Sequence, residues 1–334
     1  MLMMQNIINI KKLNILKENK CIIITTLRNK NYFKSKLHSD IKIIITSNIV
    51  DFNLINKVYK NLSSVIDNYD YIFCIGSGRI IDLAKIIKFK LLEHNKKIKL
   101  CTIPSLLGSG AESSNSAVYY KNKSKQTISN SKCSSDFIYY DEMLYDFNSS
   151  AAKISMLDCF CQSIESIWSK KSNKISITKA YLSLDLSYKN LSEKRTNLFK
   201  NSAKASYSIG LAMNITRTTG PHALSYYLTI FNNIPHGQAV TILLIAFLKK
   251  HFIERSDNIK KDKELLILKA LKIKKINELY FLLIKILIKY DLYKKVNLSN
   301  KEIQKSISFI NSDRLANHPF KLNKKTIKEI YSEI

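Results

Sequence analysis

Four side chains in the second half of the chain form a set that could bind a divalent metal ion. Asp158 and Gln162 are four residues apart in a segment with helical periodicity, so both should project from one face of a helix. His222 and His236 each directly follow a proline. Either imidazole alone is more often a core or surface residue than a ligand. Together the four offer two imidazoles, a carboxylate and an amide oxygen, which suits Fe²⁺ or Zn²⁺ and leaves a position open to polarise a substrate carbonyl.

A glycine-containing loop in the first half has the features of a phosphate site. In YIFCIGSGRIIDLAK an apolar strand-like run enters Gly76-Ser77-Gly78, and a helical pattern follows at once. Glycines let the backbone approach a phosphate, and the first-turn N–H groups of a helix bind the anion. Arg79 opposes the helix dipole, a conflict that a bound anion would relieve, and Asp82 suits the first turn. The alternative is a tight strand-to-helix turn without a ligand.

A second loop of this kind follows the next apolar run, in TIPSLLGSGAE. Because the carboxyl ends of parallel strands share one edge of a sheet, the two loops should line one crevice, which predicts a dinucleotide site. By itself this segment could be a plain loop, and Gly-Ser-Gly is not the full dinucleotide fingerprint. The chain has only seven glycines, and six of them lie in or beside the candidate sites, which indicates positions where a Cβ is not tolerated.

The elements that carry these residues change in character near the middle of the chain. The first 150 residues alternate continuous apolar runs with helical stretches, which favours a Rossmann-like α/β domain with a buried parallel sheet. We expect strands at 21–26, 41–47, 71–76 and 98–104, helices at 53–67 and 80–93, and a helix or loop at 29–39. Residues 151–334 show long helical patterns without strand-like alternation, so we expect an all-helical second domain beginning near 148–152.

Composition narrows the class of protein. A chain of 334 residues is longer than a single hydrophobic core usually supports, which favours two domains, and an apolar content of 46% is ample for globular cores. No apolar run is as long as a membrane span, and the N-terminus does not resemble a secretory signal.

The net charge of +28 raises the alternative of a nucleic-acid-binding protein, but the lysines are spread along the whole chain without a basic stripe. The six cysteines lack metal or disulfide spacing. We therefore expect a cytoplasmic protein that binds neither nucleic acid nor membrane.

The motifs together resemble a known family, the iron-containing (group III) alcohol dehydrogenases. IGSGRIIDLAK resembles the family's GGGSxxDxAK loop, and TIPSLLGSGAE resembles TIPTTAGTGSE. LDCFCQSIESIWS resembles the D-A-L-x-H-A-I-E helix, and GPHALSYYLTIFNNIPHGQAV resembles the segment that carries two metal histidines. The matches are collinear over roughly residues 20 to 334 and include DRLANHPF near the C-terminus.

This resemblance implies a dehydroquinate synthase-like architecture, a divalent metal with Fe²⁺ favoured over Zn²⁺, and NAD(P)H as cofactor. It implies metal binding by Asp158, Gln162, His222 and His236. It also implies a dinucleotide cradle made by Gly76, Ser77, Gly78, Arg79 and Asp82, with Ser105, Ser109 and Lys125 beside it. The chain departs from the family pattern at four positions, namely Arg79 for Ser, Leu106 for Thr, Gln162 for His and Tyr226 for His.

Gln162 followed by IESIWS, together with NITRTTGPHALSY, is similar to the phosphonoacetaldehyde reductases within this family. That resemblance implies reduction of an aldehyde to a primary alcohol, namely phosphonoacetaldehyde to 2-hydroxyethylphosphonate. We expect Arg217 to bind the phosphonate, since a guanidinium can hold a dianion in a bidentate way. Tyr226, one helical turn from His222, could relay a proton or be a core tyrosine. We also expect a homodimer.

Two other functions stay open at this point. The first is a generic iron-containing alcohol dehydrogenase that acts on neutral short-chain alcohols or aldehydes. The second is a catalytically weakened basic protein that binds nucleic acid or serves as a scaffold. The substituted cofactor loop and the net charge of +28 favour this alternative.

Overall fold

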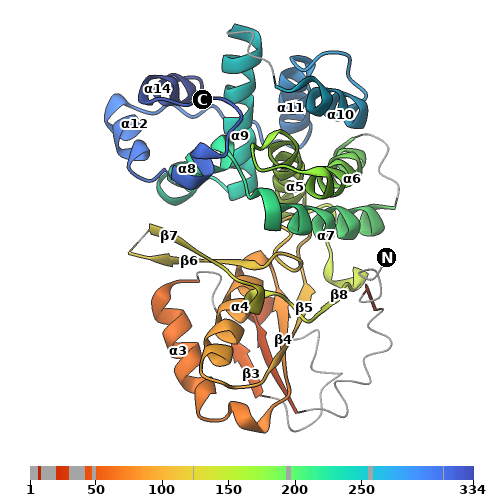
Figure 1. Cartoon of the computed structure of the whole chain (residues 1–334), viewed down its shortest axis with the longest axis vertical. Coiled ribbons are helices and arrows are strands. Elements are labelled where there is room, and N and C mark those ends of the chain that lie inside the picture. The colour runs from red at the N-terminus through yellow and green to blue at the C-terminus, as the bar shows by residue number, and fades with distance from the viewer. Residues whose placement is uncertain are drawn as a thin grey trace. The chain divides into compact units, whose positions relative to one another are not determined.

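The structure, a computed structural model, describes residues 7–8, 20–29, 42–46, 50–122, 124–192, 197–254, 259–310 and 312–334. It forms two compact units, Met1–Tyr145 and Asp146–Ile334, which are described separately below (Figure 1). The expected segment at 29–39 lies outside the described residues except for Asn29.

The first unit contains a parallel sheet with the strand order β1-β8-β5-β4-β2-β3 among the described residues. Its strands are β1 (Ile7–Ile8), β2 (Cys21–Thr25), β3 (Lys42–Ile45), β4 (Tyr71–Gly76), β5 (Lys99–Pro104) and β8 (Phe137–Tyr139). The four expected strands correspond to β2 through β5. The sequence missed β1 and β8, which are too short for a periodicity to develop, and the antiparallel hairpin β6 (Ser116–Lys121) and β7 (Ser124–Ser129), which is largely polar.

Both faces of the sheet are buried, as expected for parallel strands. Alternate residues of β2, β4 and β5 enter two separate apolar clusters, for example Ile72 and Cys74 in one and Phe73 and Ile75 in the other. Helices α3 (Phe52–Ser63) and α4 (Gly78–Glu93) add their apolar residues to the first cluster. Short 3-10 turns lie at Ile66–Asn68, Ser131–Cys133 and Glu142–Leu144. The α/β class of this unit is therefore confirmed.

The second unit contains only helices in its described residues. They are α5 (Ser150–Trp168), α6 (Lys174–Leu191), α7 (Leu198–Thr216), α8 (Gly220–Phe231), α9 (His236–Leu248) with a π-helical extension at Lys249–Glu254, α10 (Lys261–Leu271), α11 (Glu278–Lys289), α12 (Asn300–Ile307), α13 (Ser312–Ala316) and α14 (Lys324–Ser332). Helix α5 is buried from Met156 to Trp168 and packs against α6, α7 and α9. A helix enclosed in this way fixes the polar side chains that it carries.

All six cysteines are buried, and none of them forms a disulfide bond. Burial raises the pKa of the Cys21 thiol to about 11, which keeps it protonated at neutral pH. Among the described residues, none of the helices combines the length and the apolar character that crossing a membrane requires.

Candidate functional site

Helix α5 presents three polar side chains on one buried face. Asp158, Gln162 and Glu165 follow one another at spacings of four and three residues and are 7%, 5% and 0% exposed. Gln162 Nε2 donates to Asp158 Oδ2 at 3.1 Å. Gln162 Oε1 is buried and accepts no hydrogen bond within the described part of the chain. A buried acceptor left over in this way is expected where a ligand completes the site.

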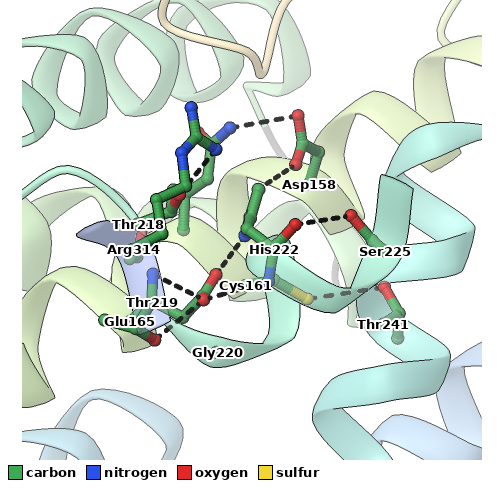
Figure 2. A network of polar contacts seen from close by, with 12 residues as sticks. Asp158, Cys161, Glu165, Thr218, Thr219, Gly220, His222, Ser225, Thr241 and Arg314 are labelled. Carbon is green, nitrogen blue, oxygen red and sulfur yellow. Dashed lines mark hydrogen bonds and ion pairs between the residues drawn. The ribbon is translucent and has the colours of Figure 1, made fainter. Parts of the chain in front are cut away.

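His222 lies between the carboxylates of Asp158 and Glu165, as Figure 2 shows. Its Nδ1 makes a short contact with Glu165 Oε2, and its Nε2 lies 3.1 Å from Asp158 Oδ1. The other oxygen of Glu165 accepts from Thr219 N at 3.0 Å, from Thr219 Oγ1 at 2.9 Å and from His222 N at 3.3 Å. Glu165 therefore holds both the ring and the backbone at the start of α8, and directs Nε2 towards Asp158.

Helix α9 brings His236 to the same place. A Cβ added at Gly237 would collide with the Ile154 carbonyl oxygen and approach Asp158 Cβ to 3.1 Å, so glycine is what lets α9 begin against α5. The His236 ring then lies 5.3 Å from the His222 ring, edge to face. The ligand atoms of Asp158, His222 and His236 all lie within 4.8 Å of one another.

These donors fit a divalent cation. Two imidazoles, one carboxylate and the unpartnered Gln162 oxygen form a mixed nitrogen and oxygen set of the kind that Fe²⁺ and Zn²⁺ accept. Burial lowers the pKa of His222, but Glu165 and Asp158 outweigh it, and the net pKa is raised. The two carboxylates thus favour positive charge at this place, as a metal site requires.

Tyr226 lies one turn beyond His222, and its ring stacks on His236 at 6.3 Å with an interplanar angle of 10°. Beside it is Arg314 of α13, whose Cζ is 5.5 Å from the Tyr226 ring centroid. Arg314 Nη1 also donates to Thr218 Oγ1 at 2.9 Å. Arg217, in contrast, is exposed at the C-cap of α7 with φ 54° and ψ −162°.

In the first unit, the two predicted loops meet at the carboxyl edge of β4 and β5. Ser105 N donates to Gly76 O at 2.9 Å, and a Cβ added at Gly78 would lie 2.6 Å from Ser109 Oγ. Helix α4 begins directly after Ser77, which gives it no side-chain cap. A helix that starts directly after a glycine-containing loop, without a side-chain cap, is the arrangement found at phosphate sites. Arg79 is exposed in this turn.

The predicted residues Asp82 and Lys125 are electrostatic neighbours in this unit. Burial raises the pKa of Asp82 to about 6, while Lys85, the Val118 amide and Lys125 oppose the rise. Lys85 itself is 0% exposed, and burial lowers its pKa. Its ammonium group donates to Ala111 O and Ser114 Oγ at 2.9 Å each, and also to Ser116 O. Lys85 therefore attaches the loop after β5 to α4.

Sequence reasoning missed three residues that the structure brings to these sites: Glu165, Lys85 and Arg314. Glu165 could have been found, because a carboxylate seven residues after Asp158 in an apolar helix falls on the same face. Lys85 likewise is a charged residue within the apolar pattern of α4. Arg314 had no local signal, because its partner Thr218 is 96 positions away.

Comparison with curated proteins gives two distant relatives. One is a phosphonoacetaldehyde reductase of Streptomyces viridochromogenes, 25% identical over 169 residues, or 48% of this chain and 43% of the relative. The other is a 4-hydroxybutyrate dehydrogenase of Clostridium kluyveri, 23% identical over 226 residues, or 61% of this chain and 60% of the relative. Each match thus spans less than two thirds of the relative's own length.

Solved structures match the fold over nearly the whole chain. A sulfoacetaldehyde reductase from Bifidobacterium kashiwanohense in complex with NAD⁺ has a TM-score of 0.81 at 17% identity, covering 94% of this chain and 90% of that one. An iron-containing alcohol dehydrogenase from Thermotoga maritima has a TM-score of 0.76 at 20% identity, with coverages of 97% and 94%.

Two family models account for most of the sequence. The model of the iron-containing alcohol dehydrogenases matches residues 11–142, and the model of the family's C-terminal region matches residues 152–334. With the motifs, the metal-binding geometry and the fold in agreement, the chain belongs to the iron-containing alcohol dehydrogenase family.

Proposed function

We propose that this chain is a metal-dependent, NAD(P)H-linked reductase that converts a short aldehyde to a primary alcohol, with phosphonoacetaldehyde as its substrate. The observation that carries the proposal is that the ligand atoms of buried Asp158, buried His222 and half-buried His236 lie within 4.8 Å of one another, while Glu165 contacts His222 Nδ1. Family membership adds the reaction class.

The residues of the second unit would hold the metal and orient the substrate. A divalent ion bound by Asp158, Gln162, His222 and His236, with Fe²⁺ preferred, would polarise the aldehyde oxygen. Glu165 keeps the His222 ring in one tautomer, because Nδ1 is committed to the carboxylate. Tyr226, whose ring is a neighbour of both Arg314 and His236, would pass a proton through its hydroxyl.

The loops of the first unit would hold the coenzyme, whose nicotinamide supplies the hydride. The uncapped start of α4 at Gly76, Ser77 and Gly78 would bind a phosphate, and Arg79 would add a positive charge. Ser105, Ser109, Asp82 and Lys125 would flank it. No acidic residue follows β2, where Thr26 and exposed Arg28 lie, which supports acceptance of NADPH as well as NADH.

The names of the relatives support an anionic substrate. Phosphonoacetaldehyde, 4-hydroxybutyrate and sulfoacetaldehyde all carry an acidic group at the end opposite the reacting carbon. Two arginines on this chain are candidates to bind such a group, Arg217 and Arg314. We also propose that the protein is a homodimer and that it is located in the cytoplasm. Six buried cysteines without a disulfide bond suit that reducing compartment.

A substrate panel tests the proposal. The protein would be purified anaerobically, its metal content measured, and NADH and NADPH oxidation followed with phosphonoacetaldehyde, sulfoacetaldehyde, succinic semialdehyde and propionaldehyde. We expect kcat/KM for phosphonoacetaldehyde to exceed that for propionaldehyde by about 10- to 100-fold, the usual effect of pairing a charged group. An equal or higher value for propionaldehyde would establish the generic alcohol dehydrogenase instead.

The nucleic-acid alternative is tested separately. Salt-dependent binding of duplex DNA without metal or NAD(P)H binding would support it. We expect metal and coenzyme binding to be retained.

A further inference from the structure

Arg314 contacts two residues that are near His222 in the chain, Thr218 and Tyr226. Its Nη1 donates to Thr218 Oγ1 at 2.9 Å, and Thr218 is only 4% exposed. Three residues along the chain, Asn317 Nδ2 donates to Thr216 O at 2.5 Å and to Thr218 O at 3.2 Å. The segment that carries Arg314 is therefore attached at several points to the turn that leads into His222.

The guanidinium also shares a neighbour with the metal site. Arg314 Cζ lies 5.5 Å from the Tyr226 ring, and the same ring stacks on His236. Tyr226 is 4% exposed and is one helical turn from His222. A guanidinium tolerates such partly dry surroundings better than an ammonium group, because it is weakly hydrated and stacks on aromatic faces.

We propose that Arg314, rather than Arg217, binds the acidic group of the substrate and so determines specificity. The inference rests on the proposed function for the reaction itself. The ligand chemistry is a tetrahedral oxyanion on a short aldehyde, because a guanidinium fork holds two oxygens of such a group at once. Thr218 supplies a hydroxyl beside the same nitrogen.

Arg217 provides the matched control. It is also an arginine and lies one residue from Thr218, but its side chain is exposed. Arg217→Ala therefore shows the effect of losing an exposed arginine in this region, and Arg314→Ala shows the effect of losing the arginine next to Tyr226.

The experiment compares Arg314→Ala, Arg314→Lys and Arg217→Ala with the wild type, using phosphonoacetaldehyde and propionaldehyde. We expect Arg314→Ala to lower kcat/KM for phosphonoacetaldehyde by about 10- to 100-fold, mainly through KM, and to change propionaldehyde reduction less than about threefold. Arg314→Lys should recover part of the loss, because it keeps the charge without the fork. Metal content should equal that of the wild type in all three. Equal losses on both aldehydes, or a selective loss in Arg217→Ala, would overturn the assignment.

Binding of methylphosphonate, measured by calorimetry in the presence of metal, separates this inference from the proposed function. If the wild type shows no preference for phosphonoacetaldehyde, the proposed substrate is wrong. Weaker methylphosphonate binding in Arg314→Ala would still support the anion site, whereas equal binding in both proteins would refute it.

Discussion

Glu165 uses both carboxylate oxygens, and it has no exposed surface. One oxygen accepts from the Thr219 backbone, the Thr219 hydroxyl and the His222 backbone, and the other contacts His222 Nδ1. Both oxygens of this buried carboxylate therefore have hydrogen-bond partners, and the side chain is held in one orientation. One oxygen stabilises the turn before α8, and the other orients the His222 imidazole. We therefore expect Glu165 to contribute both to folding and to metal binding, and the two contributions can be measured separately.

The variant Glu165→Gln tests this role. A glutamine keeps the shape but replaces one acceptor oxygen with a donor, so either Thr219 or His222 loses its partner. We expect metal affinity to fall about 10- to 100-fold and the free energy of unfolding to fall by about 1–3 kcal/mol. Titration with Fe²⁺ or Zn²⁺ and urea denaturation measure the two effects. As a control, Glu112→Gln alters a buried glutamate of the first unit and should leave metal affinity unchanged.

Asp82 gives a prediction about pH. Its pKa rises from 3.8 in the unfolded chain to about 6 in the fold, mainly through burial. The folded state therefore binds the proton more tightly, and this group's stabilisation is present below pH 4 and lost as the pH rises through 6. Relative to Asp82→Asn, the wild type should lose about 2 kcal/mol between pH 4 and 7. Urea denaturation at several pH values measures the difference, and two parallel pH profiles would contradict the prediction.

At the scale of elements, the turn between α7 and α8, beside the candidate metal site, has a backbone conformation that side-chain hydrogen bonds hold in place. Arg217 has a positive φ of 54° with ψ −162°, a region that is almost restricted to glycine. Asn317 binds the carbonyls on both sides of it, and Glu165 binds the Thr219 amide that follows. Long-range hydrogen bonds therefore impose a backbone conformation that the local sequence disfavours.

Replacing Arg217 by glycine should remove this strain. We expect Arg217→Gly to raise the free energy of unfolding by about 1 kcal/mol, because relief of the strained backbone exceeds the entropy cost of glycine. Arg217→Ala retains a Cβ and should show no such gain. Urea denaturation of both variants checks this, and equal stability of the two would show that the turn is not strained.

At the scale of the whole molecule, the candidate metal site joins segments that are far apart in the chain. Its proposed ligands come from α5, α8 and α9, and each of these helices packs against others. A ligand that binds only this arrangement stabilises the folded state over the unfolded one. Metal binding is therefore expected to contribute to stability as well as to chemistry.

Removal of the metal should lower the stability of the protein. At a metal concentration about 100 times Kd, the expected contribution is about 2.7 kcal/mol, which a chelator should abolish. Thermal or urea unfolding with and without chelator measures it. Asp158→Ala, which removes one ligand, should unfold at the same point in both conditions, and a wild type that did not respond to the chelator would argue against a bound metal.

The sequence by itself was sufficient for the α/β and helical units, the loops after β4 and β5, and the set Asp158, His222 and His236. The units and the loops depend on short-range periodicity and on local motifs, which can be read along the chain. The three metal-site residues are up to 78 positions apart, and they were predicted as a set from their ligand chemistry and from the family motifs that carry them. Gln162 fits the predicted ligand set, because its buried side-chain oxygen accepts no hydrogen bond from the described residues.

The proposal of Arg314 in place of Arg217 rests on the tertiary structure alone. Arg217 is five residues from His222 in sequence, but the turn at positive φ leaves its side chain exposed. Arg314 reaches Thr218 across 96 positions, through packing of the C-terminal helices. Side-chain direction at a turn depends on backbone angles that distant residues impose, here Asn317 and Glu165, and no spacing along the chain carries that information.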